Sequence, residues 1–148
     1  MKIQILKNKF LLTLFFLTIC FGANAETIKI LAIGNSFSED AVENYLYELG
    51  KADGIDFVIG NLYIGGCSLE THWNNADKNN SNYEYRKIVN GVKTNSGNTS
   101  LETGIADENW DYISFQQASP NSGQYNTYFP YLADMLAYVK TKVTNPNV

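Results

Sequence analysis

The stretch that decides the fold is "ILAIGNSFSED", residues 30–40. An apolar run ends there in Gly-Asn-Ser, and acidic residues follow at once. Residues 28–33 are almost wholly apolar and rich in β-branched side chains, which predicts a buried strand. A helix is predicted over 39–53, because apolar residues recur there at helical spacing. These residues are Val42, Tyr45, Leu46 and Leu49. Ser36 therefore lies at a junction, where a serine can cap a helix or act as a nucleophile.

The segments that follow repeat the pattern of strand and helix. "IDFVIGNLY" at 55–63 predicts a second strand, and a short helix is expected over 68–76. "WDYISFQQ" at 110–117 predicts a third strand. Strands and helices at this spacing imply right-handed crossovers and a parallel sheet. Residues 83–94 predict a small β-hairpin around an Asn-Gly turn, inserted on this α/β architecture.

Two further helices are expected downstream. A short one is predicted over 101–108, after a polar loop at 95–100. In the other, five apolar residues fall at spacings of 3, 4, 3 and 4, which predicts one buried stripe. The stripe consists of Phe129, Leu132, Leu136, Val139 and Val143.

The first 25 residues predict a cleavable secretory signal peptide. Lys2, Lys7 and Lys9 accompany an apolar run of 12 residues, and "ANA" at 23–25 supplies small residues for cleavage. The run is shorter than the roughly 20 residues that a membrane-spanning helix needs. We expect cleavage after Ala25, a single domain over 26–148, and a secreted or periplasmic product that spans no membrane.

The composition of residues 26–148 argues against several classes of function. Loss of the three lysines leaves 8 basic and 15 acidic residues, a net charge of −7, which disfavours nucleic acid or an anionic membrane surface as partner. Cys67 then has no intramolecular partner for a disulfide. With His72 as the chain's one histidine, a metal site is not expected. The turn after the first strand lacks G-x-G-x-x-G, which argues against dinucleotide binding.

Polar and glycine residues follow each of the three predicted parallel strands. Ligands of open parallel sheets bind outside the carboxyl ends of the strands, and acyl transfer needs a nucleophile with donors aimed at the oxyanion. Each feature also has a structural interpretation, since Ser36 with Glu39 fits an S-x-x-E capping box. The cap and the nucleophile are compatible, because both require a helix start. The three groups are Gly34-Asn35-Ser36, Gly65-Gly66-Cys67-Ser68 and Gln116-Gln117.

Together, these features resemble the SGNH (GDSL-type) hydrolases. The segment from Gly34 to Ser38 looks like the first block of that superfamily, with Asn35 where most members have Asp. "SFQQAS" resembles the Gln-containing third block of sialate O-acetylesterase-like relatives. More narrowly, "LAIGNSFSED", "GGCSLETHW", "WDYISFQQAS" and "SGQYNTYFPYL" are together similar to the domain of unknown function 4886 family of secreted SGNH-like proteins.

The resemblance implies a flavodoxin-like, three-layer α/β fold and a serine esterase. Ser36 would attack the acyl carbonyl. The N–H groups of Ser36 and of Gly66 (or Gly65) would hold the oxyanion. The side-chain amide of Gln117 would be a further donor, and Gln116 is the alternative for this role.

A small-molecule or glycan ester is the implied substrate, with removal of acetyl or another short acyl group from carbohydrate. Asn35, Gln116, His72 and Trp73 are the expected substrate contacts. No metal or organic cofactor is implied, and the oligomeric state stays open.

One departure from the family pattern concerns the general base. The Asp-x-x-His block that supplies it is not found before Val148. His72 lies only six or seven residues after the second-block glycine, and Leu69 stands where the Asp would be. We therefore expect the chain to be the N-terminal portion of the fold, nearly inactive alone, with a His and an Asp beyond Val148.

Two rival functions are open. A cysteine enzyme would use Cys67 and His72, but on a short helix the two would lie on different faces, so Cys67 is better interpreted as a small buried hydrophobe. A non-catalytic carbohydrate-binding module is the stronger rival. Trp73, Tyr83 and Tyr85 beside an Asn-rich segment could stack on sugars.

Overall fold

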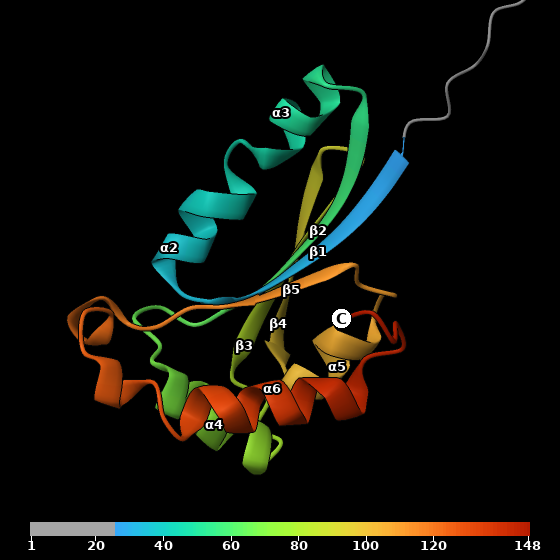
Figure 1. The fold of residues 1–148 in the computed structure, drawn as a ribbon. Helices are drawn as coiled ribbons and strands as arrows, with labels where there is room; N and C mark the ends of the chain where they lie inside the picture. The colour runs from blue at the N-terminus through green and yellow to red at the C-terminus, as the bar shows by residue number, and fades with distance from the viewer. Residues whose placement is uncertain (1–25) are drawn as a thin grey trace, which may run out of the picture.

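A computed structural model describes residues 26–148, so the predicted signal peptide lies outside the described residues (Figure 1). No helix within these residues is long and apolar enough to cross a membrane. The helices are α2 (Ser36–Ser38), the π-helix η1 (Glu39–Glu43), α3 (Leu46–Ala52), α4 (Leu69–Asp77), α5 (Leu101–Ala106), the 3₁₀ turns η2 (Ser119–Asn121) and η3 (Tyr125–Thr127), and α6 (Tyr131–Lys142). The strands are β1 (Glu26–Gly34), β2 (Ile55–Tyr63), β3 (Tyr83–Val89), β4 (Val92–Thr99) and β5 (Tyr112–Phe115).

The strands form one five-stranded sheet in the order β4-β3-β2-β1-β5. β1 lies between β2 and β5 and pairs in parallel with both, which confirms the three predicted parallel strands. β3 pairs antiparallel with β2 from Ile59↔Ile88 to Tyr63↔Glu84, and β4 pairs antiparallel with β3. The sheet is therefore mixed rather than parallel, and the hairpin continues the sheet by pairing with an edge of β2 that would otherwise stay open.

The hairpin is longer than the predicted 83–94. Asn90 and Gly91 both have positive φ, as the two-residue turn requires. The polar residues that follow were expected to form a loop, but Ser96 and Thr99 pair with β3, so β4 continues to Thr99. A polar strand is stable here because β4 is exposed at the edge of the sheet and needs only backbone pairing.

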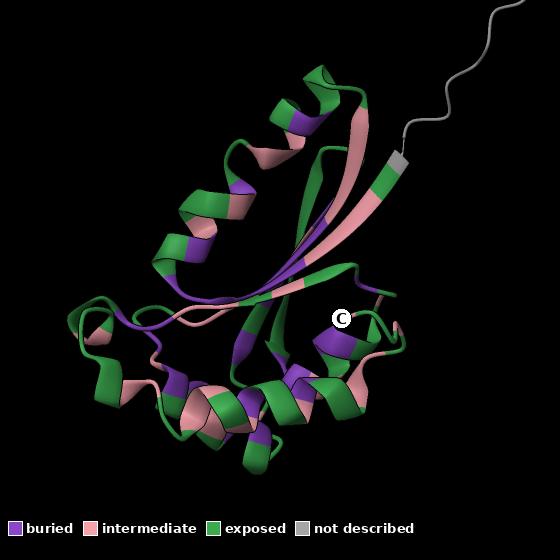
Figure 2. Cartoon of the chain, in the orientation of Figure 1, coloured by how far each residue is buried: buried purple, intermediate pink, exposed green. Residues whose placement is uncertain are grey.

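Helices cover both faces of the sheet, which gives three layers (Figure 1). α2, η1 and α3 lie over one face, and α4, α5 and α6 lie over the other (Figure 1). The largest apolar cluster is on the side of α4, α5 and α6, where Figure 2 shows buried helix surfaces turned towards the sheet. It consists of Leu31, Ile33, Leu62, Ala76, Tyr83, Tyr85, Leu101, Ile105, Trp110, Met135 and Val139.

The prediction of one helix over 39–53 is wrong about where the helix starts, whether it is continuous and which face is buried. It begins at Ser36, passes into η1, and is interrupted at Tyr45 before α3 begins. Tyr45 and Leu49 of the predicted apolar stripe are 71% and 65% exposed. Ser38 and Glu43 are buried instead, because their polar groups pair with the sheet residue Asn61.

The stripe predicted for the last helix is confirmed at Val139 and Val143 and wrong at Phe129 and Leu136. Met135 and Val139 of α6 are 0% and 3% exposed, whereas Phe129 and Leu136 are 47% and 44% exposed. Phe129 precedes the helix, which begins at Tyr131. Met135 and Val139 are four residues apart and so share the face that contacts the core.

This difference predicts two unequal effects on stability. Met135→Ala would leave a cavity in the apolar cluster and lower the free energy of unfolding by about 2–5 kcal/mol. Leu136→Ala, one residue further along the same helix, would lower it by less than about 1 kcal/mol. Urea unfolding followed by circular dichroism measures both values, and equal losses would show that the predicted stripe, rather than the observed one, faces the core.

Candidate active site

Asn35 joins the carboxyl ends of the three parallel strands. It follows β1 directly and is 1% exposed. Its Nδ2 donates to the carbonyl oxygen of Cys67 at 3.0 Å, in the segment after β2, and to that of Gln117 at 3.2 Å, after β5. Its Oδ1 accepts from the N–H of Phe37 at 3.1 Å. The prediction that Asn35 contacts substrate is therefore wrong, because its side chain is buried and occupied by these three bonds.

Ser36 is the first residue of α2 and is exposed to solvent. Asn35 is the N-cap, so the predicted capping box of Ser36 and Glu39 is wrong. The Ser36 hydroxyl makes no hydrogen bond within residues 26–148. An exposed, unoccupied hydroxyl at the end of the central strand is the arrangement that a nucleophile needs.

Gly65 and Gly66 form the predicted turn after β2. The N–H of Cys67 donates to the carbonyl of Ile64 at 3.2 Å, and Gly66 has a φ of +65°, so the turn resembles type II. A side chain at Gly66 would be strained in this conformation. Both glycines are exposed, and in the described chain neither N–H donates a hydrogen bond. The turn can therefore offer backbone N–H groups to a ligand.

Gln117 is 6% exposed and its amide is fully occupied. Its Oε1 accepts from the N–H groups of Leu69 at 3.0 Å and Ala118 at 2.9 Å. Its Nε2 donates to the carbonyl oxygen of Thr127 at 3.1 Å and to Oγ1 of the same residue at 3.3 Å. The amide therefore links α4 to the segment after β5 and does not point into open space.

A hollow of about 390 Å³ opens at the ends of β1 and β5. This volume lies within the range of small-molecule sites. The hollow contains aromatic rings and neutral polar groups and no charged side chain. Its lining residues are Phe37, Phe115, Gln116, Gln117, Ser122 and Tyr128.

Residues 118–130 form one wall of this hollow and bond mainly to themselves. The Tyr128 hydroxyl donates to the Ser122 carbonyl at 2.9 Å, and Thr127 Oγ1 donates to the Gln124 carbonyl at 2.7 Å. Tyr125 and Phe129 form an exposed aromatic pair with ring centroids 5.4 Å apart. The wall shows no strand or helix periodicity in its sequence, because its order comes from side chain to backbone bonds.

His72 is buried in the core and does not reach the candidate site. Its ring is 0% exposed, its Nδ1 lies 2.9 Å from the Tyr83 hydroxyl, and the two rings stack with centroids 5.7 Å apart. Cys67 Sγ lies 3.5 Å from the same Nδ1. The prediction that Cys67 and His72 face different directions is wrong, because Cys67 precedes the N-cap Ser68 and is not on the helix. A substrate contact by His72 is excluded by its burial.

The same burial argues against a cysteine enzyme. Desolvation raises the pKa of the Cys67 thiol to about 12 and lowers the pKa of His72 to about 4, so both are neutral at pH 7. Two of the three aromatic residues proposed to stack on sugars are buried as well. Tyr83 and Tyr85 belong to the apolar cluster, so their predicted sugar-binding role is wrong. Trp73 is partly buried, packs against the same cluster and does not line the hollow, so its substrate contact stays a prediction.

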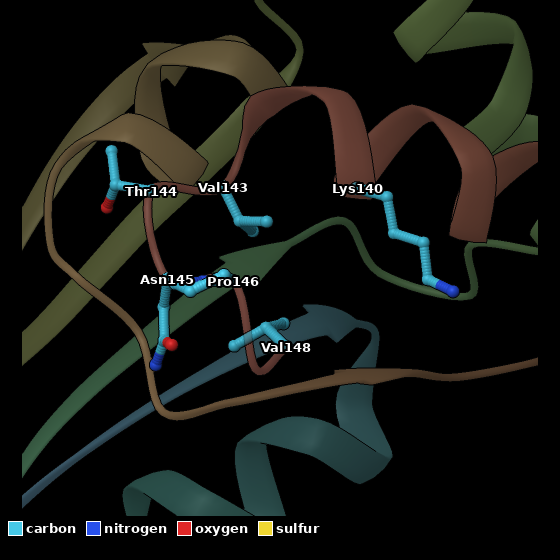
Figure 3. A pocket seen from close by; sticks show the side chains of 6 residues that line it. All are labelled: Lys140, Val143, Thr144, Asn145, Pro146 and Val148. Carbon is cyan, nitrogen blue, oxygen red and sulfur yellow. The ribbon is translucent and has the colours of Figure 1, made fainter.

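A second hollow, of about 450 Å³, lies at the opposite end of β5 (Figure 3). Asn145 lines it and donates to the carbonyl of Trp110, just before that strand begins. Figure 3 shows three of the residues that line it, Val143, Val148 and Lys140, the last extending from α6. It contains no serine, cysteine, histidine or carboxylate side chain, so the smaller hollow near Ser36 is the better candidate site.

Within residues 26–148 no group of His, Cys, Asp and Glu side chains is arranged to hold a metal ion.

The buried thiol yields a first prediction for the site. Within residues 26–148, Cys67 is the only cysteine. At pH 8 its raised pKa would make folded Cys67 react with iodoacetamide about 10³-fold more slowly than an ordinary thiol. Mass spectrometry would follow the reaction, with urea-unfolded protein as the control. Equal rates in the folded and unfolded protein would contradict the burial of the thiol.

The buried imidazole predicts a dependence of stability on pH. His72 has an ordinary pKa of 6.5 when unfolded and a pKa of about 4 when folded, so between these values the unfolded state binds more protons. The free energy of unfolding should therefore fall, by up to about 3 kcal/mol, as pH drops from 6.5 to 4. Urea titrations across this range measure the slope. His72→Gln should flatten it relative to the parent, and an unchanged slope would show that His72 titrates normally.

Comparison with known proteins gives a family and one similar structure. Residues 29–148 match the family described as Domain of unknown function (DUF4886). A crystal structure of a DUF4886 family protein from Bacteroides uniformis ATCC 8492 is 52% identical and superposes with a TM-score of 0.80. The match covers 83% of this chain and 48% of that one, so the chain corresponds to about half the length of its relative. The comparison with curated proteins gives no match. The four sequence blocks that indicated this family are confirmed, and the protein belongs to the DUF4886 family.

Proposed function

We propose that this protein is an SGNH-type ester hydrolase with Ser36 as its nucleophile. The observation that carries the proposal is the set of bonds made by Asn35. These bonds hold the exposed Ser36 hydroxyl, the segment after the Gly65-Gly66 turn, and the end of β5 together at one edge of the sheet. Open α/β sheets bind ligands at this edge, and the donors on it are of the kind that stabilises an oxyanion.

The reaction would proceed through an acyl-serine. Ser36 Oγ attacks the acyl carbonyl carbon while its proton passes to a general base. The developing oxyanion accepts hydrogen bonds from the N–H groups of Ser36 and Gly66 (or Gly65), which have no partner in the described chain. The carbon–oxygen bond to the alcohol then breaks, the alcohol leaves with a proton, and water hydrolyses the acyl-serine.

The general base of this proposal would come from outside the described residues. His72 is the only histidine in the chain, and it is buried against Tyr83. A serine without a base is a poor nucleophile at pH 7, so the matched half of the protein alone would turn over slowly. A His and an Asp from elsewhere in the full-length protein would complete the site.

A carbohydrate carrying a short acyl ester is the substrate class that we propose. The hollow lined by Phe37, the residue after Ser36, has no charged lining, which suits a neutral ligand, and aromatic rings such as Phe37 and Tyr128 suit the apolar face of a sugar. We also propose a secreted or periplasmic location, which rests on the predicted signal peptide. The exposed rings also favour a second candidate function, a carbohydrate-binding module without catalysis.

Ser36→Ala distinguishes these two functions. In the full-length protein it should abolish hydrolysis of p-nitrophenyl acetate, with a loss of at least about 10³-fold in kcat, because it removes the proposed nucleophile. Ser81→Ala, at an exposed position in the segment after α4, is the matched control and should have no effect.

Two outcomes would contradict the esterase. One is parent-level turnover by Ser36→Ala, which would place the nucleophile elsewhere. The other is saturable binding of oligosaccharides, measured by calorimetry, without turnover of acetylated or aryl esters. That second result would support the binding module.

A further inference from the structure

We propose that the two adjacent glutamines after β5 have different roles at the site. Gln116 supplies the side-chain amide that faces the substrate carbonyl. Gln117 is a positioning residue that holds the walls of the hollow. This inference rests on the proposed esterase function, and it reverses the order of the two glutamines expected from the sequence resemblance.

The bonds of Gln117 leave no group for a substrate. An amide oxygen has two acceptor sites and an amide nitrogen has two N–H groups. The two acceptor sites of Oε1 receive the N–H groups of Leu69 and Ala118, and Nε2 is directed at two oxygens of Thr127. Leu69 and Ala118 are 1% and 7% exposed. Turning the amide towards an oxyanion would leave two buried N–H groups without partners, which is unfavourable.

These bonds connect two parts of the site that are far apart in sequence. Leu69 is the first residue of α4, shortly after the Gly65-Gly66 turn. Thr127 lies at the end of η3, in the aromatic wall formed by residues 118–130. Gln117 thus fixes the distance between two parts of the site. One is the Gly65-Gly66 turn with its backbone donors, and the other is the wall that lines the hollow. Its effect on a substrate would be exerted through these neighbours.

Gln116 has the opposite environment. Its backbone N–H donates to the Ile33 carbonyl at 3.1 Å, so the residue is fixed to β1. Its side chain lines the hollow beside Phe37, which follows Ser36 directly. Its Oε1 is buried over Gly34 without a hydrogen-bond donor, whereas its Nε2 reaches solvent and donates no hydrogen bond within residues 26–148. In this orientation the amide presents its two N–H groups outwards, where a substrate oxygen could accept from them.

Gly34 permits this placement. A Cβ at Gly34 would lie 3.0 Å from Oε1 of Gln116 and 2.6 Å from Oγ of Ser38. Any larger residue would therefore push the Gln116 amide outwards from the end of β1. The close approach of the two strand ends is what places the Gln116 amide against Gly34, two residues before Ser36.

Kinetics of the full-length protein with p-nitrophenyl acetate test the first role. Gln116→Leu removes a donor used only in the transition state, so kcat should fall by about 10²-fold with little change in KM. Gln117→Leu should act mainly on KM, with a change in kcat of less than about tenfold. Asn74→Leu removes an exposed side-chain amide on α4, outside the lining of the hollow, so it is the matched control and should match the parent.

Hydrogen exchange tests the second role without reference to activity. Gln117→Leu should speed exchange at the N–H groups of Leu69 and Ala118 by at least about tenfold, because both lose their acceptor. Gln116→Leu and Asn74→Leu should leave both rates unchanged. Mass spectrometry or NMR of the full-length protein gives these rates.

The results separate this inference from the proposed function. Two results would overturn both assignments together. One is a large loss of kcat in Gln117→Leu with unchanged KM and unchanged exchange rates, and the other is a parent-level kcat in Gln116→Leu. Parent-level turnover by Ser36→Ala, or no turnover by the parent, would overturn the esterase and the Gln116 donor with it. The exchange rates would still decide whether Gln117 has the positioning role.

Discussion

The candidate site depends on one buried amide, the side chain of Asn35. Its two N–H groups bind carbonyls from the segments after β2 and β5, and its oxygen caps the helix that begins with Ser36. Each of these segments ends a parallel strand, so a single side chain determines how three separate turns meet. A residue without this amide would leave two carbonyls and one N–H without partners in a region that water does not reach.

The segment that carries Ser36 is attached to the sheet by polar groups rather than by apolar packing. Ser38 Oγ contacts Asn61 Oδ1 at 3.0 Å, and Asn61 Nδ2 donates to the buried carboxylate of Glu43. Glu43 is paired with Arg86 and Lys93 from the hairpin. Buried charges need such partners, and a network with directional bonds allows fewer arrangements than apolar contacts do. The opposite face of the sheet carries the large apolar cluster and supplies most of the hydrophobic stabilisation.

Residue types that carry chemistry in other settings are part of the core here. Cys67, His72 and Tyr83 lie in contact, and burial keeps the thiol and the imidazole neutral. Nothing in the sequence around His72 distinguishes a ligand from a buried ring. Whether the ring is buried depends on Tyr83, which lies on strand β3, whereas His72 lies on helix α4. The two glutamines illustrate the same point, since adjacent identical side chains point into different surroundings.

The sequence by itself determined the α/β class, the three parallel strands, the Asn-Gly hairpin, the turn at Gly65-Gly66 and the family, because these depend on local patterns of apolar, glycine and polar residues. It did not determine which face of each helix is buried, where the hairpin pairs, or which polar groups remain free. Tertiary structure decided these, because they depend on partners distant in the chain, such as Leu69 and Thr127 for Gln117 and Asn61 for Ser38. A hydrogen-bond donor is available to a substrate only if no such partner has taken it, and that condition is set by the fold.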